Sequence, residues 1–250
     1  MNTNTTHWTS IWGNAVSIAE NRPESYSKNI TLRYPIYSHF AGEAIRLTFD
    51  NYCGTEAITI SKTTLLINNE FVTVTFDQKP SVTIPAGVRI VSDEIACEVV
   101  AKSIFFVSFY LEDYTQMRSM VYASGPLSTG IYAVSDCTME KDIPINISRN
   151  TNNFYFLSNV SVLTKKENRC IVCYGDSITA QDWPNYLALE FNDWMRTTDL
   201  VDGCIDFDKA LCDPDNPSAF LSVYDSGDHL HPSKEGYKKM AETVMKELLY

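Results

Sequence analysis

The sequence predicts a β-sandwich followed by an α/β portion. Between about residues 28 and 165, short runs rich in Val, Ile, Thr, Phe and Tyr alternate with turn residues, with no helical pattern between them. Evenly spaced short strands of this kind are typical of sandwiches and jelly rolls. After about residue 165 the hydrophobic period changes, and strands alternate with helices, which predicts a parallel sheet. We therefore expect a β-sandwich accessory domain over 1–165 and an α/β domain over 166–250.

The first region contains at least seven runs that we interpret as strands. Turn residues such as Gly42, Gly54 and the pair Asn68 and Asn69 separate them. Because the strands are short and regularly spaced, we expect a jelly-roll-like arrangement. The runs are 31–36, 45–49, 57–60, 71–76, 82–85, 89–91 and 104–110.

The pattern of the second region predicts a strand, a helix, a second strand and a second helix, in that order. The apolar runs 170–174 and 201–207 predict buried strands, and apolar residues from Trp183 onward recur at helical spacing after the N-cap candidate Asp182. The chain ends in a predicted helix with Ser233 as its N-cap. The apolar face of that helix consists of Tyr237, Met240, Ala241, Val244, Met245, Leu248 and Leu249.

Charge and composition exclude several classes of function. The 250 residues carry 20 basic and 31 acidic side chains, a formal net charge of −11, without a cluster of Lys and Arg. Binding to nucleic acid or to a membrane is therefore not expected. The first ten residues lack the basic and apolar regions of a secretory signal, and seven cysteines, an odd number, fit reduced thiols. We expect a cytoplasmic protein.

Cys170 and Cys173 form a C-x-x-C pair inside a predicted strand. Residues three apart on a strand point to opposite faces, which suits neither a zinc site nor a redox pair. We expect no metal and no cofactor.

Two polar segments of the second region are candidates for chemistry. Ser177 follows a buried strand and a Gly-Asp turn, which predicts a hydroxyl at the carboxyl end of a parallel strand, where open α/β sheets bind ligands. A serine nucleophile needs a base, and the base needs an orienting acceptor. In the segment 228–232, Asp228 lies three residues before His231 and could accept a hydrogen bond from its ring. Either segment alone is commonly a turn or a cap, but together they favour catalysis.

Alternatives exist for two of these roles. His229 is the second candidate for the base, although a loop histidine is its simpler interpretation. Asp206 and Asp208, at the end of the second predicted strand, could orient a histidine, although carboxylates at strand ends are commonly solvated.

Both segments resemble blocks of a known family. Residues 170–180, CIVCYGDSITA, are similar to the first block of the SGNH (GDSL-type) hydrolases, and 228–233, DHLHPS, to the last. The segments 12–15, 32–35 and 106–110 resemble the β-sandwich that precedes this domain in some bacterial members. The resemblance implies a three-layer α/β domain and a serine esterase for small acyl esters, often O-acetyl groups of carbohydrates. It implies Ser177 as nucleophile and backbone oxyanion donor, His231 as base and Asp228 as orienting acid.

The resemblance also has a gap. In the family, a second block supplies a glycine N–H and a third an asparagine side chain to the oxyanion hole, and we find neither between Ser177 and Asp228. Asn192 and Asp193 imitate the third block but fall within the predicted helix. A five-stranded doubly wound sheet needs about 130 residues, whereas 169–250 supplies 82. We expect a shortened domain of impaired activity that rests on the sandwich or on a second copy of the chain.

The competing hypothesis is a catalytically inactive hydrolase remnant on a carbohydrate-binding β-sandwich. Trp8, Trp12, Tyr34 and Tyr37 could line a sugar site in the sandwich. Aromatic residues more commonly belong to the core. A small acyl ester or an acetylated carbohydrate is thus the expected substrate of the esterase, and a carbohydrate is the expected ligand under the competing hypothesis.

Overall fold

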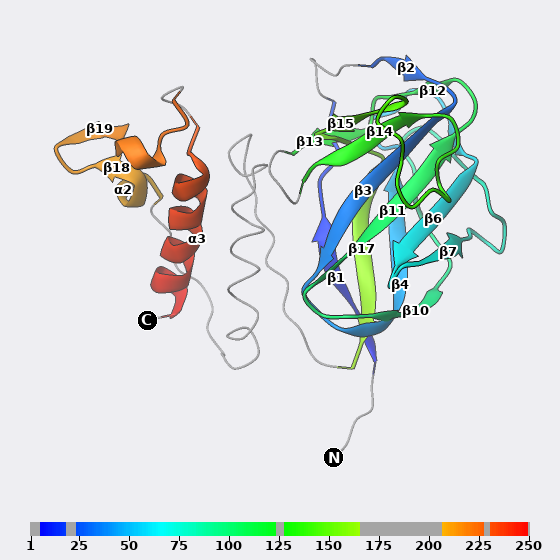
Figure 1. Ribbon diagram of the computed structural model, residues 1–250, viewed down its shortest axis with the longest axis horizontal. Helices are drawn as coiled ribbons and strands as arrows, with labels where there is room; N and C mark the ends of the chain where they lie inside the picture. The colour runs from blue at the N-terminus through cyan, green and yellow to red at the C-terminus, as the bar shows by residue number, and fades with distance from the viewer. Residues whose placement is uncertain (1–5, 19–23, 124–127, 166–206, 228–230, 250) are drawn as a thin grey trace. The chain divides into compact units, whose positions relative to one another are not determined.

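A computed structural model describes residues 6–18, 24–123, 128–165, 207–227 and 231–249 (Figure 1). The chain divides into two compact units, Met1–Cys170 and Ile171–Tyr250.

The first unit contains two large antiparallel sheets (Figure 1). The first sheet has the order β1 (His7–Gly13), β17 (Leu157–Thr164), β4 (Gly42–Asp50) and β10 (Ile95–Val99), and β9 (Arg89–Val91) also pairs with β4. The second sheet has the order β15 (Ser148–Thr151), β14 (Gly130–Val134), β3 (Ile30–Ser38), β11 (Ser103–Leu111), β6 (Lys62–Ile67) and β7 (Glu70–Val74).

Three two-stranded ribbons complete the described part of this unit. They pair β2 (Tyr26–Ser27) with β12 (Thr115–Gln116), β13 (Met120–Tyr122) with β16 (Asn153–Tyr155), and β5 (Ile58–Ile60) with β8 (Val82–Ile84). All three pairings are antiparallel. In Figure 1, β2 and β12 lie together at one end of the unit.

The core of the sandwich is formed by every second residue of its strands, because alternate side chains of a strand point to the same face. Alternate residues of β3 point inward and are buried, and their partners across the ladder on β11 are buried as well. The inward residues of these two strands are Ile30, Leu32, Tyr34 and Ile36, and Phe105, Val107, Phe109 and Leu111. Phe49 of the first sheet meets Phe109 of the second edge to face, with ring centroids 5.2 Å apart. A β-sandwich therefore fits this unit.

Tyr34 connects the second sheet to the ribbon strand β16 through its hydroxyl. The hydroxyl accepts a hydrogen bond from the amide of Tyr155 at 2.8 Å and donates one to the carbonyl of Asn153 at 3.0 Å. Its ring stacks on Phe154, with centroids 4.3 Å apart. A Cβ atom at Gly130 would lie 2.5 Å from the Tyr34 ring, so a residue without a side chain is required there.

The described part of the second unit is a hairpin with helices. It contains α2 (Phe207–Leu211), β18 (Cys212–Asp213), β19 (Asn216–Phe220), the 3₁₀ turn η1 (Ser222–Tyr224) and α3 (Lys234–Leu249). β18 and β19 pair in antiparallel fashion, and the Asp213 carboxylate accepts the amide of Asp215 at 2.9 Å across the turn. Helix α2 packs against α3.

The final helix confirms the prediction made from its apolar face. Met240, Ala241 and Val244 are buried, and Ser233 directly precedes the helix, where its hydroxyl accepts the amide of Gly236 at 3.1 Å. That contact is the expected N-cap. No helix in the described ranges combines the length and the apolar character needed to cross a bilayer.

The predicted three-layer α/β domain with a parallel sheet is wrong. Every strand pairing in the described part of the chain is antiparallel, and the described strands of the second unit form a single hairpin. Phe207, predicted at the end of a strand, begins α2 instead. The hairpin depends on an Asx turn at Asp213, and its strands lack the β-branched residues that predict strands. The predicted strand 170–174, residues 201–206 and the helix from Trp183 lie outside the described residues.

The buried hydroxyl of Tyr34 gives a stability prediction. Tyr34→Phe leaves the buried amide of Tyr155 without its acceptor, and we expect a loss of about 1–3 kcal/mol in the free energy of unfolding. Tyr37→Phe, a change at a half-buried tyrosine of the same strand, is the matched control and should stay within about 0.5 kcal/mol. Urea unfolding of both variants measures the difference. Equal unfolding free energies for the two variants would contradict this role of Tyr34.

Candidate functional site

His231 lies directly before α3, in a loop that folds back on itself. Two backbone hydrogen bonds hold the loop across its width: the amide of Ser226 donates to the carbonyl of His231 at 3.0 Å, and that of Ser233 donates to the carbonyl of Tyr224 at 2.7 Å. An isolated antiparallel bridge joins Asp225 and Pro232 between them. The backbone at His231 is therefore fixed by pairing on both sides.

The first turn of α3 buttresses the same loop. The hydroxyl of Ser233 donates to the carbonyl of Val223 at 2.7 Å while it caps the helix. A Cβ atom at Gly236 would lie 2.7 Å from the carbonyl oxygen of Tyr224 and 2.8 Å from the Cβ of Pro232, so the helix packs closely on the loop. The described residues on either side of His231 are thus packed against the first turn of α3.

His231 is the only member of the predicted triad within the described residues, and its side chain is half-buried. The nucleophile candidate Ser177, with its oxyanion N–H, and the orienting acid Asp228 lie outside the described residues. The surroundings of the predicted base are therefore known, whereas the positions of Ser177 and Asp228 stay predictions.

The alternative residues are placed only in part. The second candidate for the base, His229, and the second candidate for the orienting acid, Asp206, lie outside the described residues. The pair Asn192 and Asp193, which imitates the third block of the family, lies outside them as well. Asp208 falls within α2 and not at the end of a strand, so its predicted position is wrong.

His39 is the buried histidine of the sandwich. It is 9% exposed, and its ring meets Tyr37 edge to face, with centroids 4.7 Å apart. Burial lowers the pKa of His39 to about 4, since a charged imidazole would lose its hydration there. At neutral pH it is an uncharged side chain that packs in the sandwich, and Tyr37, one of the candidates for a sugar site, packs against it.

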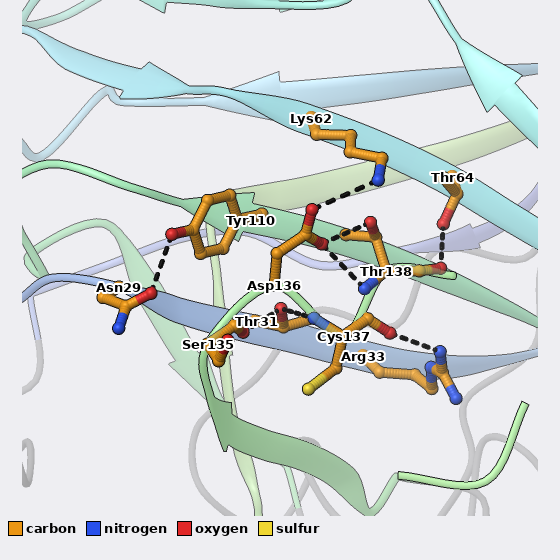
Figure 2. Close-up of polar contacts among 10 residues, drawn as sticks. All are labelled: Asn29, Thr31, Arg33, Lys62, Thr64, Tyr110, Ser135, Asp136, Cys137 and Thr138. Carbon is orange, nitrogen blue, oxygen red and sulfur yellow. Dashed lines mark hydrogen bonds and ion pairs between the residues drawn. The ribbon is translucent and has the colours of Figure 1, made fainter. Parts of the chain in front are cut away.

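A cluster of hydrogen-bonded polar side chains surrounds Arg33 (Figure 2). The strap, residues 135–141, covers the outer face of the second sheet at this point, and Arg33 is only 3% exposed. Its guanidinium donates to Ser108 Oγ on β11 at 2.7 Å. It also donates to three carbonyl oxygens of the strap, those of Cys137, Glu140 and Lys141, at 3.1, 2.5 and 3.0 Å. Burial lowers the pKa of this guanidinium, and the carbonyl oxygens replace the water that it loses.

Threonines fix the strap at two further points (Figure 2). The hydroxyl of Thr31 donates to the carbonyl of Ser135 at 2.7 Å and accepts the amide of Cys137 at 2.8 Å. On β6, the hydroxyl of Thr64 donates to the carbonyl of Thr138 at 2.7 Å. The strap is therefore bonded to outward-facing side chains of two strands, β3 and β6. Ser108 of β11, which lies between them, bonds to Arg33.

Asp136 carries a negative charge at the outer side of the strap. Its carboxylate accepts the amide of Thr138 at 3.0 Å and an ammonium hydrogen bond from Lys62 at 3.1 Å. Partial burial raises the pKa of Asp136, but the hydrogen bonds from the hydroxyl and the amide of Thr138 and from Lys62 outweigh it, and the net pKa is lowered. Because the polar groups around Arg33 and Asp136 bond to one another, we interpret this cluster as the attachment of the strap to the sheet and not as a reactive centre.

The aromatic residues proposed for a sugar site take part in packing. Tyr34 is fully buried, and Trp12 packs on Phe154 with ring centroids 5.7 Å apart. The guanidinium of Arg46 lies over the ring of Trp8, 4.1 Å from its centroid. These contacts favour a structural role for Trp8, Trp12 and Tyr34.

Sequence reasoning missed a pair of exposed tyrosines at the ribbon of β2 and β12. The rings of Tyr26 and Tyr114 lie 5.7 Å apart, centroid to centroid. The pair is formed by residues far apart in the chain, so no local pattern indicates it. The only available signal is an aromatic residue among polar neighbours in each segment.

Metal ligands and similarity to known proteins would each be independent evidence of function. Within the described ranges, no group of three or more His, Cys, Asp and Glu side chains could hold a metal ion. No family model matches the chain, and no curated protein matches its sequence.

The buried guanidinium of Arg33 gives a second stability prediction. Arg33→Met leaves buried carbonyl oxygens of the strap without donors, and we expect a loss of about 3 kcal/mol or more in the free energy of unfolding. Hydrogen exchange at the amides of Cys137 and Thr138 should accelerate. Arg46→Met is the control, because it removes an exposed ion pair with Glu94 and a cation–π contact with Trp8. Each is worth about 1 kcal/mol or less at an exposed site. Unchanged exchange in the strap of Arg33→Met would contradict the attachment.

The lowered pKa of His39 predicts that the free energy of unfolding depends on pH. Its pKa is about 4 in the folded chain against an ordinary value of 6.5. As the pH falls from 6.5 to 4, the unfolded chain binds a proton that the folded chain does not. The contribution of the neutral His39 to the free energy of unfolding is therefore fully present above pH 6.5. It decreases toward pH 4, by up to about 3 kcal/mol.

Urea unfolding as a function of pH measures this effect. The difference in unfolding free energy between the parent and His39→Gln should fall between pH 6.5 and 4, because glutamine does not titrate. A difference that stays constant over this range would show that the folded chain protonates His39 normally.

Proposed function

We propose that the chain is a serine esterase for small acyl esters, with O-acetyl groups of carbohydrates as its substrate class. The observation that carries the proposal is the position of His231, whose backbone is held by pairing with Ser226 and by the adjoining first turn of α3. A general base must be held in one orientation to accept a proton from a nucleophile. The half-buried imidazole of His231 is compatible with this requirement and is partly open to solvent.

The proposal does not depend on a parallel sheet. Constellations of Ser, His and Asp perform the same chemistry on unrelated folds, so they are recognised by geometry and role. The correction of the fold class therefore leaves the roles of Ser177, His231 and Asp228 open to direct test.

In the proposed reaction, the hydroxyl oxygen of Ser177 attacks the ester carbonyl as His231 takes the hydroxyl proton. The tetrahedral intermediate collapses, its bond to the alcohol oxygen breaks, and His231 returns the proton to the departing alcohol. Water then attacks the acyl-serine with His231 again as base, which releases the carboxylic acid and restores Ser177. Asp228 orients the imidazole and stabilises its protonated form, and the N–H of Ser177 donates to the oxyanion.

The rate should be low for an enzyme of this kind. Removing one preorganised oxyanion donor typically costs about 10²–10³ in kcat. The sequence offers no candidate for two of the donors that the resemblance implies, so activated aryl esters should be hydrolysed slowly and sugar acetates more slowly still. The competing proposal, an inactive remnant on a carbohydrate-binding sandwich, expects no turnover of either.

Replacing the nucleophile tests the proposal. Ser177→Ala should abolish turnover of an aryl acetate and labelling by a fluorophosphonate probe, because both reactions require the hydroxyl oxygen of Ser177. Ser222→Ala, a change at an exposed serine of η1, is the matched control and should retain both. His231→Ala should lower the labelling rate by about 10²-fold or more, the usual contribution of a general base. Equal labelling of the parent and Ser177→Ala would exclude Ser177 as the nucleophile.

A further inference from the structure

Two tyrosines are exposed side by side at the ribbon of β2 and β12. Tyr26 is 46% exposed and Tyr114 is 71% exposed. Their ring planes are tilted by 37°, with centroids 5.7 Å apart. Apolar side chains on a protein surface are usually scattered singly. Two rings in contact, brought together from distant parts of the chain, form a defined surface that we call the tyrosine platform.

A buried glutamine holds one side of the tyrosine platform. Gln116 lies opposite Tyr26 in the ribbon and is 9% exposed. Its amide nitrogen lies 2.9 Å from the hydroxyl of Thr55 and 3.4 Å from that of Tyr26, and its carbonyl oxygen accepts the amide of Thr55 at 2.9 Å. Tyr26 is thus anchored before any ligand binds, which lowers the entropy that binding would cost.

The surroundings of the tyrosine platform are polar. The ammonium group of Lys28 lies 5.8 Å from the ring centroid of Tyr114. Glu112 and Asp113, which precede Tyr114, are exposed. Hydrogen-bond donors and acceptors therefore lie beside two aromatic faces, whereas a site for an apolar partner would be surrounded by further apolar side chains.

This combination matches the chemistry of a sugar ring. One face of a pyranose carries C–H groups that pack on an aromatic ring, and its rim carries hydroxyls that need both donors and acceptors. Tyrosine supplies a rigid aromatic face with a polar end, and sites for small polar ligands combine aromatic walls with a few such groups. A charged ligand is less suitable, because the charge of Lys28 is offset by the two carboxylates that precede Tyr114.

We propose that the tyrosine platform of Tyr26 and Tyr114 binds a sugar ring of a polysaccharide. The choice of ligand class rests on the proposed function, but the binding does not require the esterase reaction. Binding at a second site raises the local concentration of a polymeric substrate even when each contact is weak.

The test is affinity electrophoresis of the full chain carrying Ser177→Ala, in gels that contain soluble acetylated xylan or glucomannan. We expect retardation by at least one polysaccharide. Tyr114→Ala and Tyr26→Ala should weaken binding at least about tenfold, whereas Tyr114→Trp should restore it because the aromatic face is retained. Tyr122→Ala is the matched control, since Tyr122 is 52% exposed but belongs to β13.

Each outcome bears on the proposal. Absence of retardation of the parent in both polysaccharides, or equal retardation of Tyr114→Ala and Tyr122→Ala, would overturn it. Unfolding free energies of the alanine variants should match that of the parent, which excludes loss of the fold as the cause. Aryl acetate turnover, measured on chains that retain Ser177, should not change in Tyr114→Ala. Failure of the esterase and failure of the tyrosine platform are therefore distinguishable.

Discussion

The guanidinium of Arg33 is the interaction on which the outer face of the sandwich depends. It lies on β3, in the interior of the second sheet, and four hydrogen bonds join it to β11 and to the strap. A buried charge of this kind is tolerated only when its donors are satisfied. The strap must therefore keep its carbonyl oxygens on Arg33, and Thr31 and Thr64 fix it in the register that does so.

The strands of the sandwich are predictable where alternation is strong, and the attachment of the strap is not. β3, β4 and β11 can be predicted because inward apolar residues recur at every second position. Arg33 looks like an ordinary outward-facing residue of β3, since its burial depends on a strap about a hundred residues later. The prediction of a parallel sheet is wrong because a helical period in the second region says nothing about how strands pair. An Asx turn at Asp213 directs the described strands of that unit into a hairpin.

The two candidate sites also differ in whether they can be predicted from local sequence features. Ser233 and α3 can be predicted because a cap and an apolar face are local features, and they locate His231 just before the helix. The tyrosine platform depends on the pairing of β2 with β12, which brings together residues from separate parts of the chain. In both places the chain is held by backbone or buried partners before a ligand arrives. Such preorganisation supports the proposals for a base at His231 and for a sugar ring on Tyr26 and Tyr114.

The central claim is that Ser177 and His231 act as nucleophile and base, and a crystal structure of the unmodified chain tests it most directly. The quantity to measure is the distance between Oγ of Ser177 and the nearest ring nitrogen of His231. We expect about 2.6–3.2 Å, the range of a hydrogen bond between a nucleophile and its base. An imidazole beyond the reach of that oxygen, even through one bridging water, would contradict the claim.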